Sequence, residues 1–181
     1  LEREFARSAG PIGTNLENMS KHHRNRNWAP APQPLPEDAH VIDNHTHVAS
    51  VVPFSQAMSH EAMEKGQGEV PVYSVDELLE QAQKVGVEGV IDCGCELPNL
   101  MTAIDMAREH PGTVHAAIAI HPNEAVLHGH RGAPGPDGLP IKYKPWHDIP
   151  FDEAMAEVHR LATTYPNQVV AIGETGMDLF R

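Results

Sequence analysis

Two histidines one residue apart, His45 and His47, lie at the end of the short run VIDNHTH over residues 41–47. Side chains two residues apart point the same way in a β-strand, so an H-x-H pair at a strand end directs both imidazoles into one space. Imidazole is the commonest metal ligand that proteins provide at neutral pH. The spacing therefore predicts the first part of a metal site.

Polar residues also end or follow the three later apolar runs of the sequence. His121 follows one run, Glu174 ends another, and the segment DCGC at 92–95 ends the third. Two imidazoles and a carboxylate at one edge of a sheet could hold a divalent ion. A carboxylate can also bridge two ions about 4 Å apart, a spacing that stabilises the attacking and leaving oxygens of a phosphoryl displacement.

Each of these residues also has a structural explanation. An isolated H-x-H is weak support for a metal site, Glu174 could cap a helix, and His121 could be a hydrogen-bonded structural histidine. We expect Cys93 and Cys95 to be reduced thiols at a strand end rather than ligands of a soft metal. The histidines of the long segment 122–150 are expected in a solvated loop or lid: His128, His130 and His147.

Apolar runs alternate with helical patterns from residue 39 onward, which predicts an α/β fold. Strands joined by crossover helices form a parallel sheet, and its carboxyl edge is where α/β active sites form. The connections 48–73 and 122–150 both follow strands, so we expect them to be long loops at that edge. The predicted strands cover residues 41–45, 89–93, 114–120 and 169–174.

Capping and breaking residues delimit the helices between these strands. An S-x-x-E capping box at residues 74–77 begins the first helix. The second helix starts near Pro98 and stops before Pro111, and the third has its apolar residues between 154 and 162. The helical spacing of apolar residues in all three predicts that one face of each packs on the sheet.

Composition divides the chain of 181 residues into a proline-rich extension, 1–38, and one domain, 39–181. Met19 is a possible native start, which would make residues 1–18 an addition ahead of the natural protein. The net charge of −12 argues against a protein that coats nucleic acid through a broad basic face. Two cysteines, no signal peptide and no apolar run of membrane-spanning length predict a cytoplasmic protein without a membrane partner.

Three segments, in order and each at a predicted strand end, resemble the TatD-like family of metal-dependent deoxyribonucleases. They are DNHTH at 43–47, IHPNEA at 120–125 and AIGETGMDLFR at 171–181. The last is similar to the family's G-E-x-G-L-D-Y-Y-R stretch. The resemblance covers residues 41–181 and implies a (β/α)₈ TIM-type barrel of the amidohydrolase-like superfamily.

The resemblance also implies roles for the matched positions and a need for divalent ions. His121 would help to position a substrate phosphate, and Asp178 and Arg181 would shape the site beyond the fourth strand. Two ions, Mg²⁺, Mn²⁺ or Zn²⁺, would be bound, with a carboxylate bridging them. The implied metal ligands are His45, His47 and Glu174.

A complete barrel of this type needs about 250 residues, so residues 39–181 are expected to supply roughly its first four strands. The resemblance places two further histidine ligands and the catalytic aspartate beyond Arg181. We therefore expect the isolated chain to be inactive. The complementary C-terminal half would be either further residues of the same product or a separate chain made by a nick after Arg181.

Three functions fit these residues. The first is an exonucleolytic deoxyribonuclease that attacks single-stranded DNA or 3′ ends with metal-activated water. The second is an amidohydrolase or esterase that acts on a small molecule or an RNA ester with the same kind of site. The third is a metal-binding fragment without catalytic activity. Replacement of Glu174 in the complete protein separates catalysis from binding.

Overall fold

The computed structural model describes residues 34–67, 71–134, 138, 140 and 142–177. Most of the predicted N-terminal extension lies outside the described residues, as do Asp178 and Arg181. Their predicted roles therefore stay predictions. Within the part of the chain that is described, no helix is both long and apolar enough to cross a membrane.

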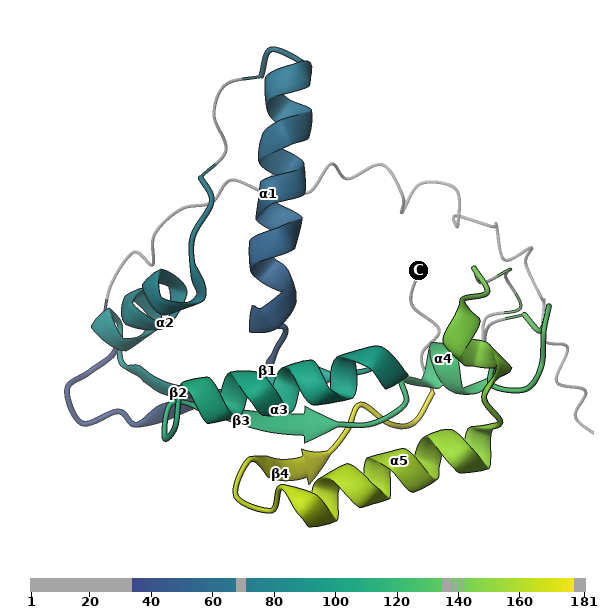
Figure 1. The fold of residues 1–181 in the computed structure, drawn as a ribbon. Coiled ribbons are helices and arrows are strands. Elements are labelled where there is room, and N and C mark those ends of the chain that lie inside the picture. Colours follow the sequence, from purple (N-terminus) through teal and green to yellow (C-terminus); the bar gives the residue numbers. More distant parts are fainter. Residues whose placement is uncertain (1–33, 68–70, 135–137, 139, 141, 178–181) are drawn as a thin grey trace, which may run out of the picture.

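Four parallel strands form one sheet in the order β1-β2-β3-β4 (Figure 1). This confirms the predicted α/β class and the parallel arrangement. Each strand lies within a few residues of its predicted place, and the third and fourth end earlier than expected. The strands are β1 (Val41–Thr46), β2 (Val87–Gly94), β3 (Val114–Ile118) and β4 (Val169–Ile172).

The three predicted helices are present, and each begins where the sequence provides a start signal. Helix α2 (Val75–Lys84) has the predicted capping box: the backbone N–H of Glu77 donates to Ser74 Oγ, and its carboxylate accepts from the Ser74 N–H. Helix α3 (Leu100–Glu109) follows a 3₁₀ turn, η2 (Leu97–Asn99), and α5 (Phe151–Thr164) follows a proline.

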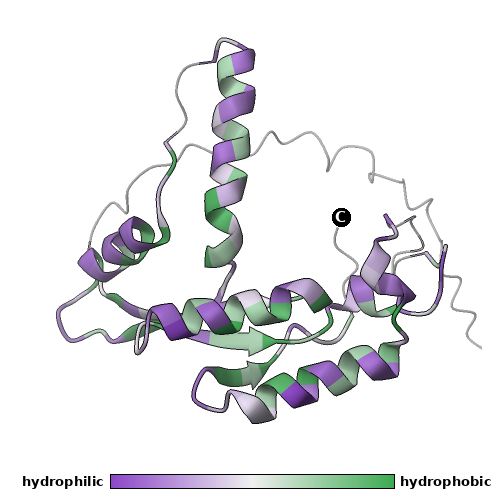
Figure 2. Cartoon of the chain, viewed as in Figure 1, coloured by the Kyte–Doolittle hydropathy of each residue, from purple (hydrophilic) through white to green (hydrophobic). Residues whose placement is uncertain are grey.

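The core lies where α3 and α5 pack together and α3 covers β2 and β3. The strands β3 and β4 are mostly hydrophobic, whereas hydrophilic residues lie along the helices (Figure 2). Gly94 on β2 lets the start of α3 pack closely against the strand, because a Cβ at this position would lie 2.8 Å from the carbonyl oxygen of Asn99. Five of the largest fully buried side chains come from this contact: Leu100, Ile104, Val114, Ile118 and Leu161.

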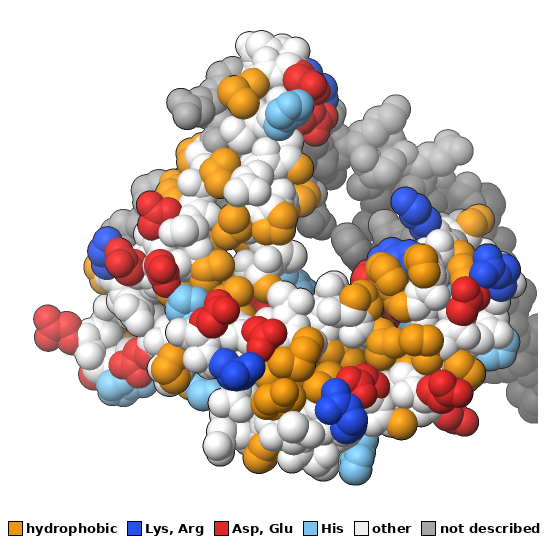
Figure 3. Space-filling view, in the orientation of Figure 1, with side chains coloured by type: hydrophobic (Ala, Val, Ile, Leu, Met, Phe, Trp, Pro, Cys, Tyr) orange, Lys and Arg blue, Asp and Glu red, His pale blue; other side chains and the backbone are white. Residues whose placement is uncertain are grey.

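The connection at 48–73 differs from the predicted loop, because residues 48–64 form a 17-residue helix, α1 (Val48–Glu64). Its buried residues recur only every seventh position, at Val48, Ser55 and Ala62, and Pro53 lies inside it. These features hide the usual helical pattern. The helix stands away from the sheet and carries exposed hydrophobic side chains (Figure 3).

The second long connection contains a short helix, α4 (Pro122–Ala125), and a 3₁₀ turn, η3 (Pro145–Asp148). The prediction that its histidines are solvated is correct for His130 and wrong for His128 and His147, which are 1% and 0% exposed. Both buried rings have hydrogen-bond partners within the same segment, so they hold it in a defined conformation.

Candidate metal centre

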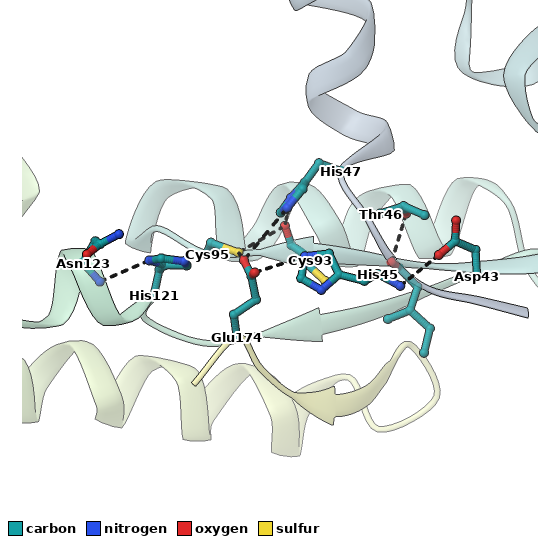
Figure 4. A network of polar contacts seen from close by, with 10 residues as sticks. Asp43, His45, Thr46, His47, Cys93, Cys95, His121, Asn123 and Glu174 are labelled. Atoms are coloured by element: carbon teal, nitrogen blue, oxygen red, sulfur yellow. Dashed lines mark hydrogen bonds and ion pairs between the residues drawn. The ribbon is translucent and has the colours of Figure 1, made fainter. Parts of the chain in front are cut away.

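The carboxyl edge of the sheet brings His45, His47 and Glu174 together (Figure 4). His45 Nε2 lies 3.0 Å from one oxygen of Glu174, and His47 Nε2 lies 3.9 Å from the other. One ligand atom from each residue lies within 4.8 Å of those of the other two. Two imidazole nitrogens and a carboxylate at this spacing fit the donor set of a divalent zinc or manganese ion.

This contact joins the two outer strands of the sheet. His45 belongs to β1, and Glu174 lies just beyond β4, with β2 and β3 between them. Three strand spacings correspond to roughly 14 Å in a flat sheet. Both side chains extend from their strand ends, so that Nε2 of His45 and a carboxylate oxygen of Glu174 come within 3.0 Å of each other across this span.

His47 is held in one orientation by the neighbouring strand. It follows β1 directly and is the N-cap of α1, so the H-x-H pair spans the change from strand to helix. Its Nδ1 lies 3.2 Å from the carbonyl oxygen of Cys93, and we assign the ring proton to this nitrogen because a carbonyl only accepts. The lone pair of Nε2 then faces Glu174, as a metal ligand requires.

Glu174 has a third partner, Cys95, whose thiol donates to its second oxygen at 2.7 Å. Burial, followed by the hydrogen bond and charge of Glu174, raises the pKa of the Cys95 thiol far above its usual range. Burial and the charge of Glu174 also raise the pKa of Cys93. Neither Cys93 nor Cys95 forms a disulfide in the structure; that both are reduced thiols stays a prediction.

His121 lies at the same edge, beyond the end of β3. Its backbone N–H donates to the carbonyl oxygen of Cys95 at 2.9 Å, and its Nδ1 accepts from the backbone N–H of Asn123 at 3.1 Å. It thereby caps α4. His121 is not part of the three-residue metal group found among the described residues, so a role with substrate remains compatible with its position.

A buried polar contact beside this edge was not evident from the sequence. His147 Nε2 lies 2.5 Å from a carboxylate oxygen of Glu124, and the Trp146 indole N–H donates to the same oxygen at 3.4 Å. Lys144 forms an ion pair with Glu96, just beyond β2. These partners are far apart in sequence, and no local spacing marks them. The contacts of Glu124 hold the two ends of the 122–150 connection together, and the Lys144–Glu96 pair ties the connection to the end of β2.

Two imidazoles and a carboxylate at the carboxyl edge of a parallel α/β sheet fit the class of metal-dependent hydrolases. The family model of the TatD related DNases matches residues 42–181, which is most of the chain. The chain therefore belongs to this family, as the three sequence segments predicted. No curated protein gave a match.

Proposed function

We propose that this chain carries part of the site of a deoxyribonuclease, which cleaves phosphodiester bonds at the 3′ ends of DNA. Membership of the TatD-related family supports a metal-dependent hydrolase. The observation that carries the proposal is the convergence of His45, His47 and Glu174 from opposite edges of the sheet. When bound, divalent ions would activate a water molecule and neutralise charge on the phosphate.

Glu174 would hold the ions together with the two histidines. One of its oxygens faces His45 and the other faces His47. Cys95 donates to one of these oxygens and restrains the carboxylate. In this proposal His121 contacts the substrate phosphate, since it lies one strand end away and is anchored by the backbone of Cys95.

We further propose that additional strands complete the barrel and its site. Both outer strands have exposed apolar residues: Ile42 is 56% exposed, and Val170 and Ile172 are 52% and 53% exposed. Unpaired strand edges of this kind promote aggregation unless they are covered. The complementary half would supply the aspartate that accepts the proton of the attacking water, with Asp178 and Arg181 at the junction.

The proposal is tested with Glu174→Ala in the full-length protein, with 3′-labelled single-stranded DNA as substrate and Mn²⁺, Mg²⁺ or Zn²⁺ added. We expect the rate to fall by about 10²-fold or more, as for removal of a principal electrostatic group. Glu109→Ala is the matched control, because this exposed carboxylate lies at the end of α3. Its DNA cleavage should equal that of the wild type.

Other outcomes point to the other two functions. Hydrolysis of small amides or esters, with intact DNA ends, would favour the amidohydrolase or esterase. Ion binding that Glu174→Ala removes, without hydrolysis of either substrate class, would identify a metal-binding fragment. Size and mass measurements on the active particle identify the source of the remaining strands, since a separate half would be a second polypeptide.

A further inference from the structure

Asp92 on β2 is a buried carboxylate that the proposed reaction does not use. The residue is 1% exposed, although carboxylates are rarely buried without partners. Its Oδ1 accepts a hydrogen bond from the backbone N–H of Ala49 at 3.4 Å, and the N–H of Val48 is a second donor. Both donors belong to the first turn of α1. Asp92 therefore contacts the helix that begins at the metal centre.

Asp92 caps α1 from a neighbouring strand. The first N–H groups of a helix lack partners within it and are usually satisfied by an N-cap side chain. His47, the N-cap of α1, makes no such hydrogen bond with its side chain. The Asp92 carboxylate satisfies these donors instead, and its charge faces the positive end of the helix dipole.

The residue at this helix start is also the proposed ligand His47. Asp92 pairs with Thr46 in the β1–β2 ladder, and the hydroxyl of Thr46 donates to the carbonyl oxygen of Ile91 at 2.9 Å. The ring of His47 is anchored to the carbonyl of Cys93. Three consecutive residues of β2 therefore make these contacts: Ile91 holds the residue before His47, Asp92 holds the helix start after it, and Cys93 holds the imidazole.

We propose that Asp92 is a positioning residue for the metal centre: by capping α1, it holds His47 so that Nε2 faces Glu174. This inference rests on the proposed metal site. Asp92 also lines a cavity of about 300 Å³ that reaches His47 and the first turns of α1 and α3. Without the cap, both the N-terminus of α1 and the imidazole of His47 would have room to move into this space.

The test measures Zn²⁺ binding to the full chain by calorimetry, with no DNA present. Asp92→Ala should weaken zinc binding about 10- to 100-fold, the usual effect of losing a group that orients a ligand. Asp92→Asn keeps an acceptor oxygen at the same place, so its affinity should stay within about threefold of the wild type. Wild-type affinity in Asp92→Ala would overturn the proposal.

The matched control is Ser74→Ala, which removes the side-chain cap of α2, a helix without a proposed ligand. Its folding stability should fall, while its zinc affinity stays unchanged. If Asp92→Ala does not fold, Ala49→Pro tests the same contact through its partner. This change removes one of the two N–H groups that donate to Asp92, and proline is tolerated in the first turn of a helix. Unchanged zinc affinity in that folded variant would also overturn the proposal.

Two further comparisons separate the possible causes. If folded Asp92→Asn loses as much affinity as Asp92→Ala, the charge rather than the cap matters, and the proposal is wrong. The ¹⁵N shifts of His47 should change in Asp92→Ala and be restored in Asp92→Asn. Equal zinc binding by the wild type and His45→Ala would instead refute the metal site itself, whatever Asp92 does.

Discussion

At the scale of single residues, Glu174 organises the carboxyl edge of the sheet. Its two oxygens contact two imidazoles and one thiol, which come from two other segments of the chain. The carboxylate and the thiol also influence each other electrostatically, because Glu174 contributes to the raised pKa of Cys95. This coupling gives a chemical probe of the site that requires neither metal nor substrate.

We predict that Glu174→Gln increases the rate at which iodoacetamide alkylates Cys95 at pH 8. Burial is the first cause of the raised pKa, and the hydrogen bond and charge of Glu174 are the next. Removing the charge lowers the pKa, and each unit gives about tenfold more thiolate. Mass spectrometry of the Cys95 peptide measures the rate.

Glu109→Gln is the matched control, since it neutralises an exposed carboxylate at the far end of α3. Cys95 in this variant should react at the wild-type rate. If Glu174→Gln leaves the rate unchanged, burial alone suppresses the thiolate and the electrostatic contact with Glu174 has no effect.

The sequence predicted that His45, His47 and Glu174 come together because they end or follow apolar strands and lie in segments that resemble the family. His45, His47 and Glu174 could be placed at one edge by topology alone. The burial of His147 could not be predicted, because its partner Glu124 lies in a different turn of an irregular connection. The cap that Asp92 gives to α1 could not be predicted either, since it joins a residue of β2 to the start of α1 rather than neighbours in sequence.

At the scale of elements, local signals explain which helices could be predicted. Helices α2, α3 and α5 each combine a start signal with a regular apolar stripe. Helix α1 has neither a side-chain N-cap nor a dense stripe, and Pro53 lies inside it. Its N-terminus depends on Asp92, a tertiary partner, so its sequence alone does not indicate a helix.

The capping box of α2 gives a prediction for pH. The backbone and side-chain hydrogen bonds from Ser74 lower the pKa of Glu77 below 4.5. A carboxyl with a lowered pKa in the folded state stabilises the fold above its unfolded pKa and loses that effect as pH falls. Glu77→Gln should therefore lower the urea midpoint at pH 7 relative to the wild type.

The difference in urea midpoint between Glu77→Gln and the wild type should shrink as pH falls through the folded pKa of Glu77, which lies below 4.5. Glu109→Gln, measured in the same way, corrects for the loss of one negative charge on an exposed helix position. A destabilisation by Glu77→Gln that stays constant from pH 7 to pH 3 would show that ionisation of Glu77 does not strengthen the cap.

At the scale of the whole molecule, the candidate ion site joins the first and last strands of the described fold. An ion that binds only the folded state stabilises it by mass action, by about 2.7 kcal/mol at 100 times its dissociation constant. We predict that zinc raises the thermal midpoint of the wild-type chain and that a chelator reverses the rise. Differential scanning calorimetry measures both.

His45→Ala should abolish the zinc-dependent rise while leaving the metal-free midpoint close to that of the wild type, because His45 is half-exposed. The same rise in His45→Ala and wild type would mean that zinc stabilises the chain from another position.

The contact between the outer strands has a consequence for the order in which the chain acquires its structure. Contacts between neighbouring strands close shorter loops than the contact between His45 and Glu174, which spans almost the whole described fold. Because the entropic cost of closing a loop rises slowly with its length, this contact forms most readily once the sheet between the two strands is in place. A nascent chain would expose both histidines long before their carboxylate partner leaves the ribosome, so tight retention of an ion would mark the moment when the fourth strand is in place.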